Sequence, residues 1–200
     1  LATNEYVYNK RRLLTQETLT LAGMQSWSLG YSYSDTAALS TITYPDGEPV
    51  SYGPNALGQP THAGGYALGI YYFPNGGMQT FTYGNGIVHT LTQNERQLPE
   101  QSADTGIFDD TYSYDENANV SRIMDRLLGR VRTRSMTYDG LDRLVGAASR
   151  LFGSSGASFS YDVLDNLTHA LMPVGVGLSQ DRYFCYDENW RLTNLKTGGC

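Results

Sequence analysis

Three histidines are the residues of this sequence best suited to acid–base or metal chemistry. His62, His89 and His169 lie far apart, and none has a metal-ligand spacing to another histidine or a carboxylate pair nearby. A metal ion or a general base needs further groups placed around the imidazole. We therefore interpret them as surface or loop residues. The sequence also lacks a nucleophile-elbow motif, and its Gly-rich stretches precede no predicted helix. We predict no catalytic residue, no metal ligand and no cofactor.

Four aspartates follow a tyrosine at regular spacing. They are Asp115, Asp139, Asp162 and Asp187. Carboxylates in a repeat could form a ladder of calcium ligands, but Ca²⁺ takes about 6–8 oxygens and each repeat offers one carboxylate. A short polar side chain that bonds its own backbone two residues on starts a turn. We favour the turn interpretation.

Arginines gather between residues 122 and 134. Arg130, Arg132 and Arg134 alternate, so on a strand they would share one face. Contact with nucleic acid or a cargo protein is one interpretation, and a solvated sheet face is the other. We favour the solvated face because the chain has a net charge of -6, which disfavours nonspecific binding to nucleic acid or anionic membranes. No apolar run approaches the length of a membrane span.

The two cysteines are too few for a disulfide framework. Cys185 takes the position that Ser113, Thr137 and Ser160 hold in similar stretches. We interpret it as a small side chain on a strand rather than as a reactive thiol. Cys200, the last residue, allows no interpretation.

These residues belong to a short phrase that occurs six times. In each copy a large residue, a small residue and a tyrosine are followed by a short polar residue. Strict alternation of large and small places both large side chains on one face of a strand. The copies are Tyr6–Asn9, Tyr31–Ser34, Tyr112–Asp115, Met136–Asp139, Phe159–Asp162 and Phe184–Asp187.

A turn and a second strand follow the phrase. Six residues after the tyrosine stands an apolar residue, namely Leu14, Leu39, Val120, Leu144, Leu167 or Leu192. The tyrosines of the last four copies recur about every 24 residues, which leaves room for two strands but not for a helix as well. In the first half, Tyr44–Gly47 and Phe73–Gly76 place proline, then Asp or Asn, then glycine, as turns require. Tyr83–Gly86 is a further candidate turn. The repeating unit is thus predicted to be a β-hairpin.

The predicted fold is all-β, with consecutive hairpins forming one long, curved antiparallel sheet. We expect a single run of repeats over residues 1–200, with irregular copies in 1–110 and regular copies in 111–200. Because the chain begins at Leu1 rather than Met, we expect it to be a fragment or a processed product of a longer protein.

The segment Tyr138–Leu144 resembles the YD repeat, also called the RHS repeat, in which Tyr-Asp is followed by two variable residues, Gly, Arg or Asn, and Leu. Segments 114–120, 161–167 and 186–192 match the same frame. The glycine position holds Ala118, Asp142, Asp165 and Trp190. Ala and Trp adopt a left-handed backbone poorly, so we expect the turns at Ala118 and Trp190 to differ in shape. The terminal core signature of RHS proteins and its self-cleaving site have no match.

The resemblance implies a structural role. In bacterial RHS proteins, toxin-complex subunits and teneurins such repeats form a sheet that spirals into a hollow shell, which in the bacterial proteins encloses a toxic C-terminal domain. By resemblance we expect a non-catalytic shell segment of a secreted or cell-surface protein, whose partners are the remainder of the shell and an enclosed effector domain. The expected structural repeat residues are Tyr8, Tyr33, Tyr114, Asp115, Tyr138, Asp139, Arg143, Leu144, Tyr161, Asp162, Leu167, Tyr186, Asp187, Arg191 and Leu192.

A cell-surface module that binds carbohydrate or protein is the alternative, since the 16 tyrosines could stack on sugars. Tyrosines that point inward would favour the scaffold, and an exposed row would favour binding. An enzyme is the third hypothesis, with no motif behind it beyond the abundance of Asp and Ser.

Overall fold

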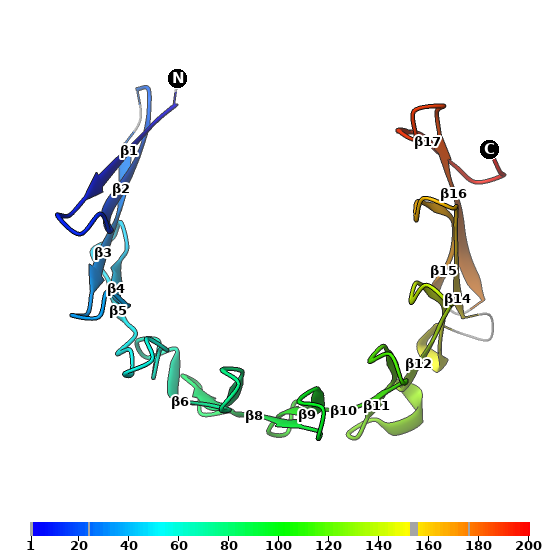
Figure 1. The fold of residues 1–200 in the computed structure, drawn as a ribbon, viewed down its shortest axis with the longest axis horizontal. Helices are drawn as coiled ribbons and strands as arrows, with labels where there is room; N and C mark the ends of the chain where they lie inside the picture. The colour runs from blue at the N-terminus through cyan, green and yellow to red at the C-terminus, as the bar shows by residue number, and fades with distance from the viewer. Residues whose placement is uncertain (1, 24, 153–155, 176) are drawn as a thin grey trace. The chain divides into compact units, whose positions relative to one another are not determined.

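The computed structural model describes residues 2–23, 25–152, 156–175 and 177–200 (Figure 1). Its elements are strands, apart from two short 3-10 helices in the described residues, η1 (Gly129–Val131) and η2 (Arg150–Phe152). The strands are β1 (Ala2–Tyr8), β2 (Leu14–Leu21), β3 (Ser26–Tyr33), β4 (Leu39–Thr43), β5 (Pro49–Ser51), β6 (Ala67–Tyr72), β7 (Met78–Tyr83), β8 (Val88–Gln93), β9 (Pro99–Asp104), β10 (Phe108–Tyr114), β11 (Val120–Asp125), β12 (Arg134–Tyr138), β13 (Leu144–Ser149), β14 (Ala157–Tyr161), β15 (Leu167–Gly175), β16 (Leu178–Tyr186) and β17 (Leu192–Lys196).

Strand pairing follows chain order, as a succession of hairpins requires. β1 to β5 form a five-stranded sheet, and β6 to β17 a twelve-stranded sheet. The pairs are antiparallel wherever their register is resolved, for example Tyr112 opposite Ile123 in β10 and β11. The predicted all-β fold of consecutive antiparallel hairpins is confirmed. Between β5 and β6, residues 52–66 form turns and irregular segments instead of strands, with one isolated bridge between Ala63 and Ala67.

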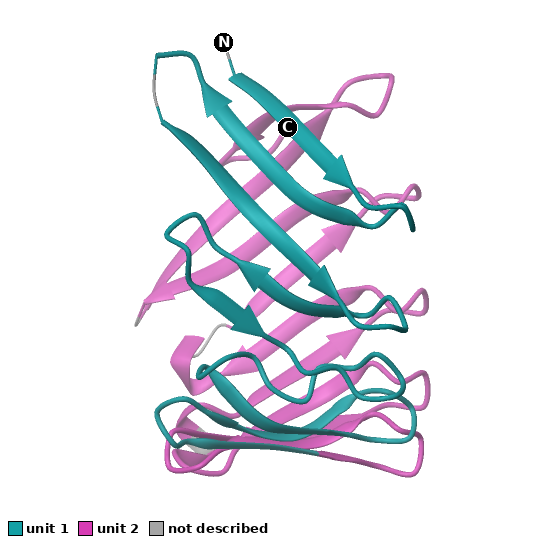
Figure 2. Cartoon of the chain, turned by 90° about the vertical axis from the view of Figure 1, so that its left-hand side faces the viewer, with its two compact units in different colours: residues 1–91 teal, residues 92–200 magenta. Residues whose placement is uncertain are grey.

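The chain divides into two compact units, residues 1–91 and 92–200 (Figure 2). Each strand of a unit contacts its neighbours in the sheet. In unit 2 the tight turns that follow β10, β12, β14 and β16 lie in a row on one side of the sheet, at the ends of the strands, as Figure 2 shows. An antiparallel meander produces this arrangement because every second connection returns to the same side.

Burial in each unit is shallow. Among the described residues the buried ones are Val50, Asp110, Ser149, Ala170 and Cys185. The repeat tyrosines, apart from Tyr8, are half-buried on the sheet face. Most contacts of the strands are with their neighbours in the sheet, so these rings are covered only in part.

The arginine run does not form a strand face as predicted. Residues 129–131 form η1, and only Arg134 of the alternating arginines lies on a strand. Its Nη2 donates to Asp110 Oδ2 at 2.6 Å, and the Asp110 side chain is buried. The local sequence gave no sign of this pair, because Asp110 lies 24 residues earlier and is brought close by sheet pairing. No helix of the described ranges is both long and apolar enough to cross a membrane.

Candidate functional site

One five-residue turn recurs through both units. In each copy the first residue's N–H donates to the carbonyl of the fifth residue, and the fourth residue's N–H donates back to the first carbonyl. The fourth residue has a positive φ in every copy. The turns begin at Asn9, Ser34, Tyr44, Asn55, Phe73, Tyr83, Asn94, Asp115, Asp139, Asp162 and Asp187. The turns predicted at Tyr44, Phe73 and Tyr83 are confirmed, whereas those beginning at Asn55 and Asn94 were missed.

The side chain of the first residue completes most of these turns. Asp139 Oδ1, for example, accepts hydrogen bonds from the N–H groups of Leu141 at 2.9 Å and Arg143 at 3.1 Å. Asp115, Asp162 and Asp187 accept in the same way. Each aspartate of the repeat therefore starts a turn. Where Tyr or Phe comes first, the Asp or Asn two residues later accepts one bond instead, as Asp46 does from Glu48 N–H.

The turns at Ala118 and Trp190 do not differ in shape, contrary to expectation. Ala118 has φ 72° and Trp190 has φ 60°, and both turns keep the shared hydrogen bonds. A left-handed non-glycine residue costs about 1–2 kcal/mol. The side-chain bonds of the first residue and the pairing of the flanking strands hold the turn in spite of that cost.

The second tyrosine of the repeat joins one hairpin to the preceding one. Its hydroxyl donates to a backbone carbonyl at the start of the preceding hairpin's return strand, at 2.7–3.0 Å. We call these bonds the tyrosine ladder. Its members are Tyr33 to Leu14, Tyr114 to Pro99, Tyr138 to Val120, Tyr161 to Leu144 and Tyr186 to Leu167. The apolar column of the sequence thus supplies acceptors through its backbone as well as apolar side chains.

Tyr8 and Leu192 lie outside the ladder. β1 pairs with β2, and the Tyr8 side chain is 59% exposed, with no hydrogen bond from its hydroxyl found among the described residues. Leu192 begins β17 and is also exposed.

Polar side chains link successive turns in the row of turns on one side of unit 2. Arg143 contacts three groups: its Nε donates to Asp139 Oδ2 at 2.8 Å, and its Nη1 donates to the Asp162 carbonyl at 3.0 Å and to Asp165 Oδ1 at 2.8 Å. Its guanidinium carbon lies 4.8 Å from the centroid of the Tyr161 ring, within cation–π range. Arg143 therefore joins its own turn to the next.

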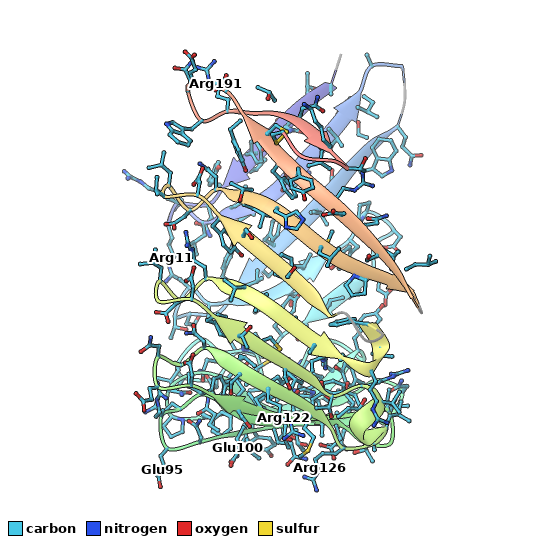
Figure 3. The ribbon with its side chains drawn as sticks, turned by 90° about the vertical axis from the view of Figure 1, so that its right-hand side faces the viewer. Arg11, Glu95, Glu100, Arg122, Arg126 and Arg191 are labelled. Carbon is cyan, nitrogen blue, oxygen red and sulfur yellow. A yellow bond between two sulfur atoms is a disulfide. The ribbon has the colours of Figure 1, made fainter. Side chains whose placement is uncertain are left out.

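Other turns use the same kind of link. Asn119 Nδ2 donates to Asp142 Oδ1 at 2.7 Å, and Arg96 Nη1 donates to the Asp115 carbonyl at 3.1 Å. In unit 1, Arg11 reaches the Asp35 carbonyl. Arg191 lies at the turn between β16 and β17 (Figure 3), where its backbone N–H bonds Asp187.

The turn bonds favour ionised aspartates. The hydrogen bond from Arg143 is the main cause that lowers the pKa of Asp139. Burial alone would raise the pKa of Asp115 and of Asp162, but hydrogen bonds from Asn119 and Asn166, respectively, outweigh it and both pKa values are lowered. Burial raises the pKa of Tyr138, which is the direction that favours the protonated hydroxyl that donates in the ladder.

His169 and Cys185 have partners that sequence analysis missed. His169 on β15 forms a hydrogen bond with Asp181 on β16, and the centroids of the His169 and Tyr183 rings lie 4.5 Å apart. His169 is therefore not a loop residue. Cys185 lies on strand β16, as interpreted, and forms a disulfide with Cys200 that the sequence did not predict. The pairing of β15 with β16 brings Asp181 close to His169. The segment after β17 brings Cys200 back to Cys185 on β16.

The solved structures show where else this arrangement of hairpins occurs. No protein-family model matches the chain, and no curated protein matches it. A crystal structure of TcdB2-TccC3 matches with a TM-score of 0.73 over 90% of this chain, at 14% identity. The chain has the fold of a segment of TcdB2-TccC3. The YD-repeat resemblance is confirmed in its fold.

Two further structures of this toxin system agree. TcdB2-TccC3-Cdc42 matches with a TM-score of 0.73 at 14% identity, and the Photorhabdus luminescens Tc holotoxin pore with a TccC3 mutation matches with a TM-score of 0.68 over 86% of this chain, at 15% identity. The chain covers 12% of the matched TcdB2-TccC3 chain and 11% of the matched holotoxin chain.

Proposed function

We propose that this chain is a non-catalytic structural segment of a longer YD-repeat shell, which encloses or presents a C-terminal effector domain. The observation that carries the proposal is the tyrosine ladder. Five repeat tyrosines donate their hydroxyl to the preceding hairpin. The side-chain N–H groups of Arg143 and Asn119 donate to the next turn. Side chains with these hydrogen bonds hold neighbouring hairpins together and are not free to act on a substrate.

Exposed apolar residues at the turns support contact with the remainder of the same shell. Leu141, Val163 and Leu164 are 68%, 89% and 53% exposed, respectively, and each sits at a tight turn of unit 2. Apolar side chains gathered on a surface are typical of contacts with further protein. The fold shared with TcdB2-TccC3, of which the chain covers a small part, agrees with a segment of a larger wall.

A secreted or cell-surface location is part of the proposal. The Cys185–Cys200 disulfide supports it, because disulfides persist in oxidising compartments.

Limited proteolysis of the parent polypeptide tests enclosure. We expect the region after residue 200 to resist protease in the wild type and to become cleavable when Tyr138→Phe, Tyr161→Phe and Tyr186→Phe are combined, since three ladder bonds are lost. Tyr8→Phe is the matched control, because that hydroxyl lies outside the ladder. Equal cleavage in all variants, or a parent gene without a downstream effector domain, would count against enclosure.

Surface binding of carbohydrate or protein is the second candidate. Tyr66 and Tyr71 favour it, being 62% and 65% exposed. A glycan array that shows binding, lost on Tyr66→Ala or Tyr71→Ala, would support this function. A blank array would weigh against its carbohydrate form.

A further inference from the structure

Unit 1 contains a cavity that the tyrosine ladder does not use. It has a volume of about 730 Å³ and lies among β3, the turn between β4 and β5, and the segment before β6. Four aromatic side chains and two carboxylates line it: Trp27, Tyr44, Tyr52, Tyr66, Asp46 and Glu48. Smaller side chains complete the lining. A concave site with aromatic walls and a few polar groups is typical of ligand pockets.

The carboxylates are held in place by the local turn. Tyr44 starts a five-residue turn in which its N–H donates to the Glu48 carbonyl. Asp46 Oδ1 accepts from Glu48 N–H at 3.1 Å, which fixes the Asp46 side chain at the turn. The Tyr66 hydroxyl donates to Glu48 Oε1 at 3.4 Å, so an aromatic ring and a carboxylate meet at one wall. Both negative groups are thereby positioned before any ligand arrives.

Gly64 precedes Tyr66 in the segment that closes the cavity, and its backbone has φ +51°. This φ suits glycine and disfavours other residues, so glycine is the residue type that favours this backbone path before Tyr66.

The electrostatics of the cavity are negative. No Lys, Arg or His lies among its described lining residues. The Lys and Arg residues of unit 1 are Lys10, Arg11 and Arg12, which follow β1 in one turn. The charge of Glu48 is the main cause that raises the pKa of Tyr66, and Asp46 adds to it. Aromatic faces carry a negative quadrupole potential, so rings and carboxylates attract the same kind of group.

We propose that this cavity binds the guanidinium or ammonium group of an Arg or Lys side chain from a basic polypeptide segment. The cation would lie against the rings of Trp27 and Tyr44 and pair with Glu48 and Asp46. A neutral sugar could use the rings but would gain no charge attraction. Charge complementarity therefore favours the basic segment.

Titration of the full chain with a short arginine peptide tests the site. The probe is an acetylated, amidated Gly-Arg-Gly-Arg-Gly peptide, and its matched control replaces arginine by citrulline, which keeps the shape and loses the charge. The chain has two tryptophans, so Trp190→Phe leaves Trp27 as the single fluorescent reporter. We expect the arginine peptide to bind at least tenfold more tightly than the citrulline peptide and to change Trp27 fluorescence.

Charge-neutralising variants locate the binding. Glu48→Gln combined with Asp46→Asn keeps side-chain size and the turn-capping oxygen, and we expect it to weaken binding at least tenfold. Glu5→Gln, on β1 and outside the cavity lining, removes one negative charge as a control and should leave binding unchanged. Circular dichroism of each variant separates loss of binding from loss of fold.

Several results would overturn the proposal. One is equal affinity for the arginine and citrulline peptides, and another is unchanged binding in the Glu48→Gln, Asp46→Asn variant. Binding of choline or of a neutral oligosaccharide without binding of the arginine peptide would assign the cavity to that other ligand.

Discussion

A tyrosine differs from a phenylalanine by one hydroxyl group, and in five repeats of this chain that hydroxyl lies 2.7–3.0 Å from a carbonyl of the preceding hairpin. A ring at the same position would still cover the sheet face. The hydroxyl adds a directed hydrogen bond between hairpins. This bond explains why the second large residue of the phrase is always Tyr, whereas the first can be Tyr, Met or Phe.

Removing one such hydroxyl should have a measurable cost. We expect Tyr138→Phe to lower the free energy of unfolding by about 1 kcal/mol, the net contribution of a typical hydrogen bond. Tyr8→Phe should leave it unchanged, because the Tyr8 hydroxyl lies outside the ladder. Urea titration followed by circular dichroism measures both. Equal losses in the two variants would refute the role of the bond.

The lowered pKa of Asp139 makes a prediction about acid stability. A carboxylate whose pKa is lower in the folded state stabilises the fold above its unfolded pKa of about 3.9, and that contribution is lost as pH falls through the folded pKa. We therefore expect the urea midpoint of the wild type to drop more between pH 7 and pH 3 than that of Asp139→Asn. Glu95→Gln, at an exposed turn residue (Figure 3), is the control and should behave as the wild type does. Parallel pH curves for Asp139→Asn and wild type would contradict this.

At the scale of the element, one turn is built in two ways. Some copies begin with Asp, Asn or Ser, whose side chain accepts bonds from the backbone, and most of these carry an ordinary residue in the left-handed position. Others begin with Tyr or Phe and have glycine there, as in Tyr83–Ile87. The turn is stabilised either by hydrogen bonds from the first side chain or by glycine, which adopts the left-handed backbone conformation without steric cost.

Exchanging residues at the left-handed position should separate the two kinds of turn. Gly86 has φ +84° and open space around it, so Gly86→Ala adds no clash and should cost about 1 kcal/mol through the backbone alone. Ala118→Gly relieves that strain and should raise stability by less than about 1 kcal/mol, since glycine also loosens the unfolded chain. Thermal unfolding of both variants measures the difference. Changes of the same sign would contradict the account.

The hairpins could be predicted from sequence because their determinants are local. Alternation of large and small residues, a polar turn starter and Pro-Asp-Gly all act within one unit. The links between hairpins could not be predicted in this way. Arg134–Asp110 and His169–Asp181 depend on register between strands, and Cys185–Cys200 depends on the path of the chain after β17. The turn at Asn94 was missed for another reason: Gln93 stands where the phrase has tyrosine, although Asn94 bonds the backbone as the aspartates do.

At the scale of the whole molecule, stability should be distributed along the chain. Within each sheet the order of strands follows the chain, as in repeat proteins whose stability is a sum of units and of interfaces between adjacent units. A local change should therefore have a local effect.

The disulfide offers a direct test of this locality. It closes a loop with a sequence separation of 15, for which a stabilisation of about 3 kcal/mol is expected. We expect Cys200→Ser, or reduction of the wild type, to accelerate amide hydrogen exchange in β16 and β17 and to leave β10 and β11 unchanged. Uniform acceleration across the chain would mean that the repeats unfold as one cooperative block.

The tyrosine ladder also has a direction in time. In every bond of the ladder the hydroxyl comes from the later residue and the carbonyl from a residue 15–19 positions earlier. A chain made from its N-terminus presents the acceptor first, so each new tyrosine meets a strand that has already left the ribosome. Such short separations make contacts fast to form. The ladder can therefore be closed one bond at a time during synthesis, each hairpin serving as the template for the next.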